Sequence, residues 1–262
     1  MQPATYETPG TLHVELRIPA GTIRARAENT ATTQLDLQGE RADEATVELR
    51  PFSGGHKLVI SAPEKRGFSF KGWELDVDLV VPIGTIVDAE TGSADVDATG
   101  VLGGLSIRSG SGDLDFETVT GDVVAKVASG DVHGGEVGGS LTVHGASGDV
   151  SVRRVAGDIT CRTASGDVTV EELGAGGQVT GVSGDIDVGA ATTGSLKLRS
   201  VSGDIAVGVA PGTGVWLDLT SASGDAVSEL AEPDGPSGEA TLEIHASSVS
   251  GDIRIASAKA GV

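Results

Sequence analysis

The chain has 262 residues, of which 40 are glycine and only 3% are aromatic, and its formal net charge is −20. This acidic excess argues against nucleic acid or anionic lipid as a partner, because such partners require clustered Lys and Arg. The single cysteine, Cys161, cannot form an internal disulfide. The apolar residues are mainly Val, Ala, Leu and Ile, which together with the glycines predict an all-β chain.

The first residues, MQPATYETPGTLHVELRIPAG, lack the basic segment and apolar run of a signal peptide. No other stretch approaches the roughly 20 apolar residues of a membrane-spanning helix, so we expect no direct membrane insertion. The sequence therefore predicts a cytoplasmic protein, or a cell-surface protein if it is a trimmed mature form.

Residues 1–84 contain several segments in which apolar and polar residues alternate, among them TTQLDLQG, HKLVISAP and WELDVDLV. IPAGTIRARA (18–27) and VPIGTIVDAE (81–90) each place a Pro-x-Gly-Thr-Ile turn before such a strand. We interpret 1–84 as wide first coils and an end cap, in which the large side chains Phe68, Phe70 and Trp73 gather. A separate small β-domain is the alternative.

Residues 85–226 are dominated by a repeated tripeptide, Ser-Gly-Asp. It begins at Ser111, Ser129, Ser147, Ser165 and Ser183 at steps of 18 residues, and then at Ser202, Ser223 and Ser250 at steps of 19, 21 and 27. A second turn, such as Gly157-Asp158, lies midway, and apolar and polar residues alternate after each turn. Short strands of this kind bury their apolar face only against the next coil. The sequence therefore predicts a single-stranded parallel β-solenoid with about 18 residues per regular coil, in which Cys161 is a core residue.

Residues 227–262 complete the predicted organisation. The segment VSELAEPDGPSGEA (227–240) interrupts the pattern with Pro, Gly and acidic residues, and we expect a surface loop there. A final C-terminal coil follows. The predicted regions are therefore wide coils and cap in 1–84, regular coils in 85–226, and acidic loop and last coil in 227–262.

Three features together resemble a known family. They are the opening strand PAGTIRARA, the segment VPIGTIVDAETGSADVDATG and the tandem SGDVxV coils. They are similar to the bacterial β-strand-repeat “putative adhesin” proteins, also called toast-rack domains, over nearly the whole chain. The resemblance implies the solenoid fold and a scaffold linked to the cell envelope or to stress, and it implies no catalytic residues.

The aspartate of the repeat recurs once per coil, at Asp113, Asp131, Asp149, Asp167 and Asp185. In register these carboxylates would stand about 5 Å apart and repel one another, so something must compensate. They could accept hydrogen bonds from backbone N–H groups of the turns, or they could hold a row of calcium ions as in nonapeptide rolls. Each Asp directly precedes an inward Val, Leu or Ile, unlike the roll motif. We therefore predict a structural turn, no metal and no cofactor, with a calcium column as the alternative.

A second column is basic. Arg108, Lys126, His144 and Arg162 follow one another at steps of 18, Thr180 breaks the run and Arg199 resumes it. The column could bind a partner, or it could balance the charge of nearby carboxylates and discourage aggregation of exposed strands. We predict Arg108, Lys126, His144, Arg162 and Arg199 as partner-binding residues.

Enzyme functions have little support in the sequence. Aromatic residues for sugar stacking are few, and the five histidines show no metal-ligand spacing, so we predict no catalytic residue and disfavour a polysaccharide substrate. The leading prediction is a non-enzymatic scaffold for a protein partner or for self-association. The alternatives are a calcium-dependent adhesin-like module and a solenoid carbohydrate-active enzyme.

Overall fold

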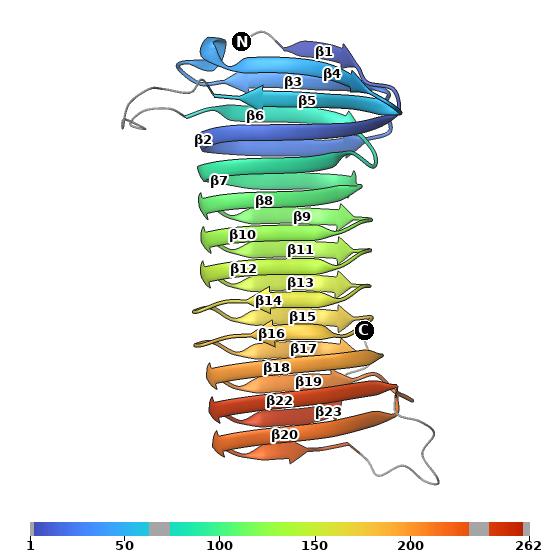
Figure 1. The fold of residues 1–262 in the computed structure, drawn as a ribbon, viewed down its shortest axis with the longest axis vertical. Helices are drawn as coiled ribbons and strands as arrows, with labels where there is room; N and C mark the ends of the chain where they lie inside the picture. The colour runs from blue at the N-terminus through green and yellow to red at the C-terminus, as the bar shows by residue number, and fades with distance from the viewer. Residues whose placement is uncertain (1–2, 63–73, 231–240, 259–262) are drawn as a thin grey trace. The chain divides into compact units, whose positions relative to one another are not determined.

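The computed structural model describes residues 3–62, 74–230 and 241–258 (Figure 1). Phe68, Phe70 and Trp73 lie outside these ranges. The chain divides into two compact units, Met1–His133 and Gly134–Val262, with the division inside β11 (Val132–Val137). The described ranges contain strands, one short 3-10 helix (η1, Ala42–Glu44) and no helix long and apolar enough to cross a membrane. Both units are parallel β-solenoid, which confirms the predicted fold class.

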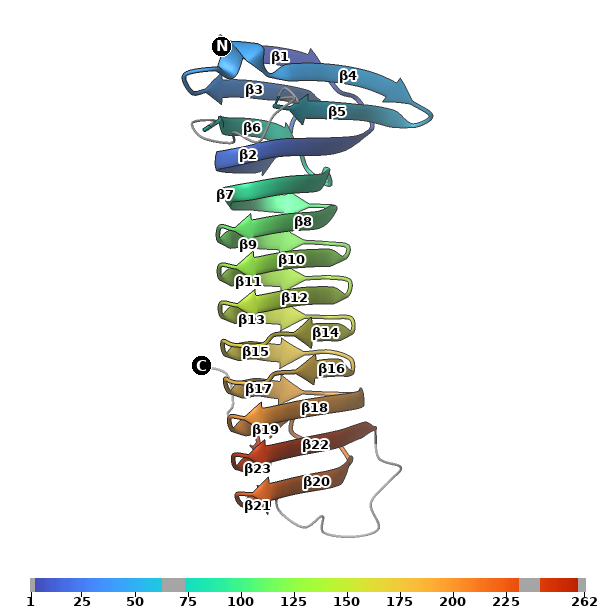
Figure 2. The ribbon, with the colours of Figure 1, turned by 60° about the vertical axis from the view of Figure 1, so that its left-hand side comes forward.

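Two long strands organise the first unit. β2 (Thr11–Glu28) and β7 (Ile86–Leu102) each supply both sides of one coil, and they pair in parallel from His13↔Ile86 to Arg26↔Thr99. β8 (Gly104–Ser111) and β9 (Leu114–Val119) stack on the two halves of β7, and β10 (Val123–Ser129) stacks on β8 (Figure 2).

The other edge of β2 carries a cap. β5 (Gly55–Ser61) and β6 (Asp76–Pro82) pair in parallel with its two halves. Beyond them the strand direction reverses, because β4 (Thr46–Phe52) is antiparallel to β5, β3 (Thr32–Gln38) to β6, and β1 (Ala4–Glu7) to β3. The cap has a core of its own, in which Leu35, Leu37, Leu58, Ile60 and Leu79 are at most 2% exposed. Antiparallel strands therefore end the parallel stack at this edge.

The second unit contains the regular coils. One side is formed by β12 (Leu141–Ser147), β14 (Ile159–Arg162), β16 (Gly177–Thr180) and β18 (Gly194–Ser202), and the other by β13 (Val150–Val155), β15 (Val168–Leu173), β17 (Ile186–Ala191) and β19 (Ile205–Val209). The repeat spacing is the strand register, since Val150 pairs with Val168 and Val168 with Ile186. These residues are buried, as predicted, and so is Cys161, whose thiol pKa is raised to about 12 by burial.

The last two coils are not stacked in chain order. After β19 the chain forms β20 (Val215–Ser223) and β21 (Ala226–Ser228), and then β22 (Leu242–Ser250) and β23 (Ile253–Ser257). β22 pairs with β18 on one edge and with β20 on the other, and β23 lies in the same way between β19 and β21 (Figure 1). The C-terminal coil is therefore inserted between two earlier coils. β21 also extends strand structure into the segment 227–240, to Ser228.

The composition of the two coils explains this order. In the inserted coil the inward residues Leu242, Ile244, Ile253 and Ile255 are at most 1% exposed. Three of their register partners in the terminal coil are smaller or more polar, namely Val215, Ala226 and Ser228, and the fourth, Leu217, equals its partner Ile244 in size. A terminal coil is covered on one side only, so the less apolar coil loses less there.

Candidate functional site

The repeated aspartates form an aspartate ladder along the turn edge of each unit. In the first unit the N–H of Asp113 donates to Asp95 Oδ1 at 3.1 Å and the N–H of Asp131 to Asp113 Oδ1 at 2.9 Å. In the second unit the same bond, 2.7–2.9 Å long, runs in the order Asp149, Asp167, Asp185, Asp204, Asp252, Asp225, with each N–H donating to the Oδ1 of the residue before it. The ladder follows the stacking order rather than the chain order, so its carboxylates hold neighbouring turns together.

The glycine of the tripeptide is required by the same turn. Gly166 has a φ of +120°, and a Cβ built on it would lie 2.1 Å from the carbonyl oxygen of Gly148 in the preceding coil. Both the backbone angle and the close approach exclude a side chain. Ser-Gly-Asp is therefore a stacking turn.

The hydrogen bonds of the aspartate ladder offset the repulsion between the stacked carboxylates. Asp113, Asp149, Asp167 and Asp185 each place one oxygen on a backbone N–H of the next coil. Within the described ranges, no group of three or more His, Cys, Asp or Glu is arranged to hold a metal ion. This geometry favours a structural role of the repeated aspartates in the turns. Calcium binding by the predicted column, which includes Asp131, stays a prediction that is tested by direct measurement.

The predicted basic residues lie on exposed outer strand faces. In the first unit Arg108 of β8 is the register partner of Lys126 of β10. On its other side Arg108 pairs with Glu90 of β7, and Glu90 with Arg17 of β2. The row in this unit thus reads Arg17, Glu90, Arg108, Lys126, with one acidic member.

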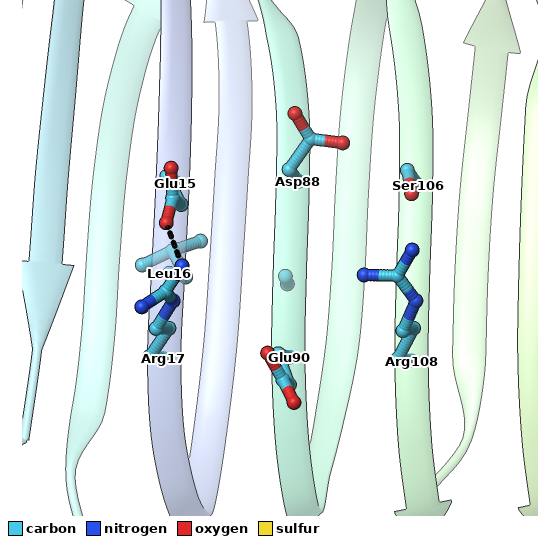
Figure 3. A pocket seen from close by; sticks show the side chains of 8 residues that line it. Glu15, Leu16, Arg17, Asp88, Glu90, Ser106 and Arg108 are labelled. Atoms are coloured by element: carbon cyan, nitrogen blue, oxygen red, sulfur yellow. Dashed lines mark ion pairs between the residues drawn. The ribbon is translucent and has the colours of Figure 1, made fainter.

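A shallow open depression of about 290 Å³ lies beside this row (Figure 3). It is lined by Glu15, Leu16, Arg17, Asp88, Ala89, Glu90, Ser106 and Arg108. Glu15 bonds Arg17 Nη2 at 2.6 Å and Lys57 Nζ at 2.5 Å. The hydrogen bond from Lys57 is the main reason that the pKa of Glu15 is lowered, against the opposing effect of partial burial. The lining contains no histidine or cysteine, so it offers charges and hydrogen bonds but no thiol nucleophile or imidazole base.

Sequence reasoning missed most of this depression. Asp88 and Glu90 stand 18 residues before Ser106 and Arg108, so the repeat spacing could have found them. Glu15 and Arg17 lie outside the repeat, and only the pairing of β2 with β7 brings them in.

In the second unit the row is His144, Arg162, Thr180, Arg199, which are consecutive register partners across β12, β14, β16 and β18. Each step is about 4.8 Å. Arg162 and Arg199 are exposed and His144 is half-buried. Lys197 lies two residues before Arg199 on the same face and was assigned no role from the sequence.

The Toastrack DUF4097 family model matches residues 13–256. This chain belongs to the Toastrack family. The match confirms the resemblance drawn from the repeat, while a search among curated proteins found no match.

Three solved structures are similar to this Toastrack chain. A “putative adhesin” from Bacteroides fragilis is 15% identical, with 97% of this chain and 95% of that one covered and a TM-score of 0.49. A “putative lipid binding protein” from Parabacteroides distasonis is 16% identical, with coverages of 97% and 96% and a TM-score of 0.46. A “putative adhesin” from the same organism is 13% identical, with the same coverages and a TM-score of 0.40.

The cations of this Toastrack protein fall into two classes. Among the residues that the structure describes, five have no ion-pair partner, and we call them the cationic row: Arg108, Lys126, Arg162, Lys197 and Arg199. Every other described Arg or Lys contacts a carboxylate. All members of the row lie on the strands that precede the Ser-Gly-Asp turn.

Proposed function

We propose that this Toastrack protein is a non-enzymatic scaffold that binds an acidic protein partner through the cationic row. The observation that carries the proposal is that, within each unit, the unpaired cations lie on the strands that precede the Ser-Gly-Asp turns, in a chain of net charge −20. Exposed cations without carboxylate partners remain available to an anionic segment, and they attract it over about 10 Å at 0.1 M salt.

The alternative is that the cationic row only balances the charge of nearby carboxylates. Two other arginines of the second unit show what such charge balance looks like. Arg154 Nη2 lies 2.5 Å from Glu172 Oε2 in the next coil, and Arg153 Nη2 lies 3.1 Å from Glu136 Oε1. Cations that serve charge balance are thus held in ion pairs. Arg162 and Arg199 are not, which favours an external partner.

The groups available for catalysis support a binding role. Cys161 is fully buried, and its raised pKa keeps the thiol protonated. His245 contacts Asp218 at 3.4 Å and forms a tilted ring contact with Trp216, with ring centroids 5.0 Å apart, and no hydroxyl or thiol nucleophile is among these contacts. The outer faces of the coils therefore present charge and hydrogen-bonding groups rather than a catalytic cluster.

The test is binding of fluorescein-labelled poly-L-glutamate, a model acidic segment, together with sedimentation of the protein alone. At low salt we expect polyglutamate binding, and we expect an Arg162→Glu/Arg199→Glu variant to bind at least about tenfold more weakly. Raising the salt to about 1 M should abolish wild-type binding, because the screening length falls to about 3 Å.

The matched control is Arg153→Glu/Arg154→Glu, which changes the net charge equally on the other strand series of the same unit. Circular dichroism confirms that each variant is folded. Equal weakening by both pairs would show a response to net charge alone. Absence of both polyglutamate binding and self-association at low salt would overturn the proposal.

A further inference from the structure

We infer that the C-terminal coil, Leu242–Ser257, is an exchangeable element through which two copies of this chain dimerise, each copy inserting its coil into the other. The partner is a second copy, and the contact is the slot between β18/β19 and β20/β21. This surface is separate from the cationic row and goes beyond the proposed function.

The slot is defined by strand pairing on both edges. β22 pairs with β18 from Gly194↔Leu242 to Ser202↔Ser250, and with β20 from Val215↔Leu242 to Ser223↔Ser250. The aspartate ladder crosses the same slot, because Asp252 donates to Asp204 and accepts from Asp225. A coil supplied by another copy would form identical contacts on both edges.

The coil contributes a large buried surface. Leu242, Ile244, Ala246, Ile253 and Ile255 are all at most 2% exposed. Both faces of this layer contact other coils, so an exchanged coil would bury the same apolar area between two chains. Exchange of an identical element is a low-cost route to a dimer for this reason.

The connection permits the exchange. Thirteen residues, 229–241, separate the end of β21 from the start of β22. A connection of this length spans up to about 45 Å when fully extended. Connections between successive regular coils of this unit are much shorter; only two residues, Thr192 and Thr193, separate β17 from β18. Within the second unit, the C-terminal coil is thus the coil most able to detach from the slot of its own copy.

The test uses the full-length chain with one new disulfide across the slot. Asp218 and His245 are register partners in β20 and β22, and their side chains already touch. Neighbouring strands place Cα atoms about 4.8 Å apart, within the range for a disulfide. We would introduce Asp218→Cys and His245→Cys, and replace the native cysteine by Cys161→Val. Valine fits this position, because Cys161 lies between Val143 and Val179 in the same inward column.

The protein is refolded at increasing concentration, separated by size exclusion, oxidised, and run on a non-reducing gel. While most of the protein is monomer, we expect the dimer-to-monomer ratio to rise about tenfold for a tenfold rise in concentration, by mass action. The dimer fraction should give covalent dimers and the monomer fraction covalent monomers. The ratio should be the same at low and high salt, which separates this dimer from association through the cationic row.

The control pair is Thr160→Cys/Gln178→Cys, register partners in β14 and β16 that exchange of the last coil leaves within one chain. It should give only monomers on the gel from both fractions. The inference is overturned if no dimer forms at any refolding concentration, or if the dimer fraction of the Asp218→Cys/His245→Cys variant runs as monomers on the gel.

Discussion

The cap of the first unit and the terminal coil of the second unit are opposite solutions to one problem. An open solenoid end exposes apolar core and unpaired backbone groups. The first unit reverses strand direction and covers its end with β1, β3 and β4; Leu35 and Leu37 of β3 are buried, and Leu49 of β4 is half-buried. The second unit instead ends in β20 and β21, whose inward residues are half-buried or exposed and include Ser221 and Ser228.

The difference shows that a solenoid end can be protected either by added structure or by composition. The cap is stabilised by burial, whereas the terminal coil limits its loss by having little apolar surface to expose. Within the described residues no strand pairs with the free edge of β20. Substitutions at the two ends should therefore lower the free energy of unfolding by different amounts.

The largest expected effect is a charge placed in the cap. Leu79 of β6 is 2% exposed, and Leu79→Asp should lower the free energy of unfolding by about 4 kcal/mol, since an unpaired buried carboxylate is costly. Leu217→Asp, in half-buried β20, should cost about 1 kcal/mol. Guanidinium unfolding followed by circular dichroism measures both. Equal losses would mean that the second end is as closely packed as the first.

An intermediate effect is expected from the aspartate ladder at the second end. Asp252→Ala removes the acceptor of the Asp225 N–H and should cost about 1 kcal/mol, with faster hydrogen exchange at that amide. Asp225→Ala should leave stability nearly unchanged, because no ladder bond in the described part of the chain ends on its carboxylate. If the two variants were equally destabilised, the ladder would not end at β21.

The smallest expected effect is that of calcium on the Ser-Gly-Asp turns, which occur in each unit. Millimolar calcium should leave the melting temperature unchanged, because a ligand stabilises a fold only in proportion to its binding. The control is Asp149→Asn/Asp167→Asn/Asp185→Asn, which keeps the Oδ1 acceptors of the ladder. A rise of many degrees that this variant lacks would establish a calcium column.

The regular coils could be predicted because their sequence period is also their register. The step of 18 residues that links Val150 to Val168 is the pairing of β13 with β15, so the inward residues followed directly. The reversal of strands in the cap could not be predicted, since alternation of apolar and polar residues carries no strand direction. The depression near Arg108 depends on the pairing of His13 with Ile86, 73 residues apart (86 − 13), which no repeat reveals.

The stacking order of the last coils could not be predicted from the sequence for a different reason. Every Ser-Gly-Asp turn presents the same backbone groups, so any coil can stack on any other. Ile255 lies in the inserted coil and its register partner Ser228 in the terminal coil. Predicting which of the two coils is covered on both sides requires comparing their whole composition, because no motif distinguishes them. The predicted region boundaries, the partner-binding role of the basic residues and the cellular location stay predictions.

The inserted coil also bears on how the protein is made. Translation proceeds from the N-terminus, so β20 and β21 leave the ribosome before the strands that separate them from β18 and β19 in the native fold. While the later strands are still missing, β20 can pair directly with β18, because the turn register is common to all coils. The native order requires that this early pairing opens to admit β22 and β23. Completion of the second unit must therefore wait until β22 and β23 have been made, and it cannot proceed coil by coil as synthesis advances.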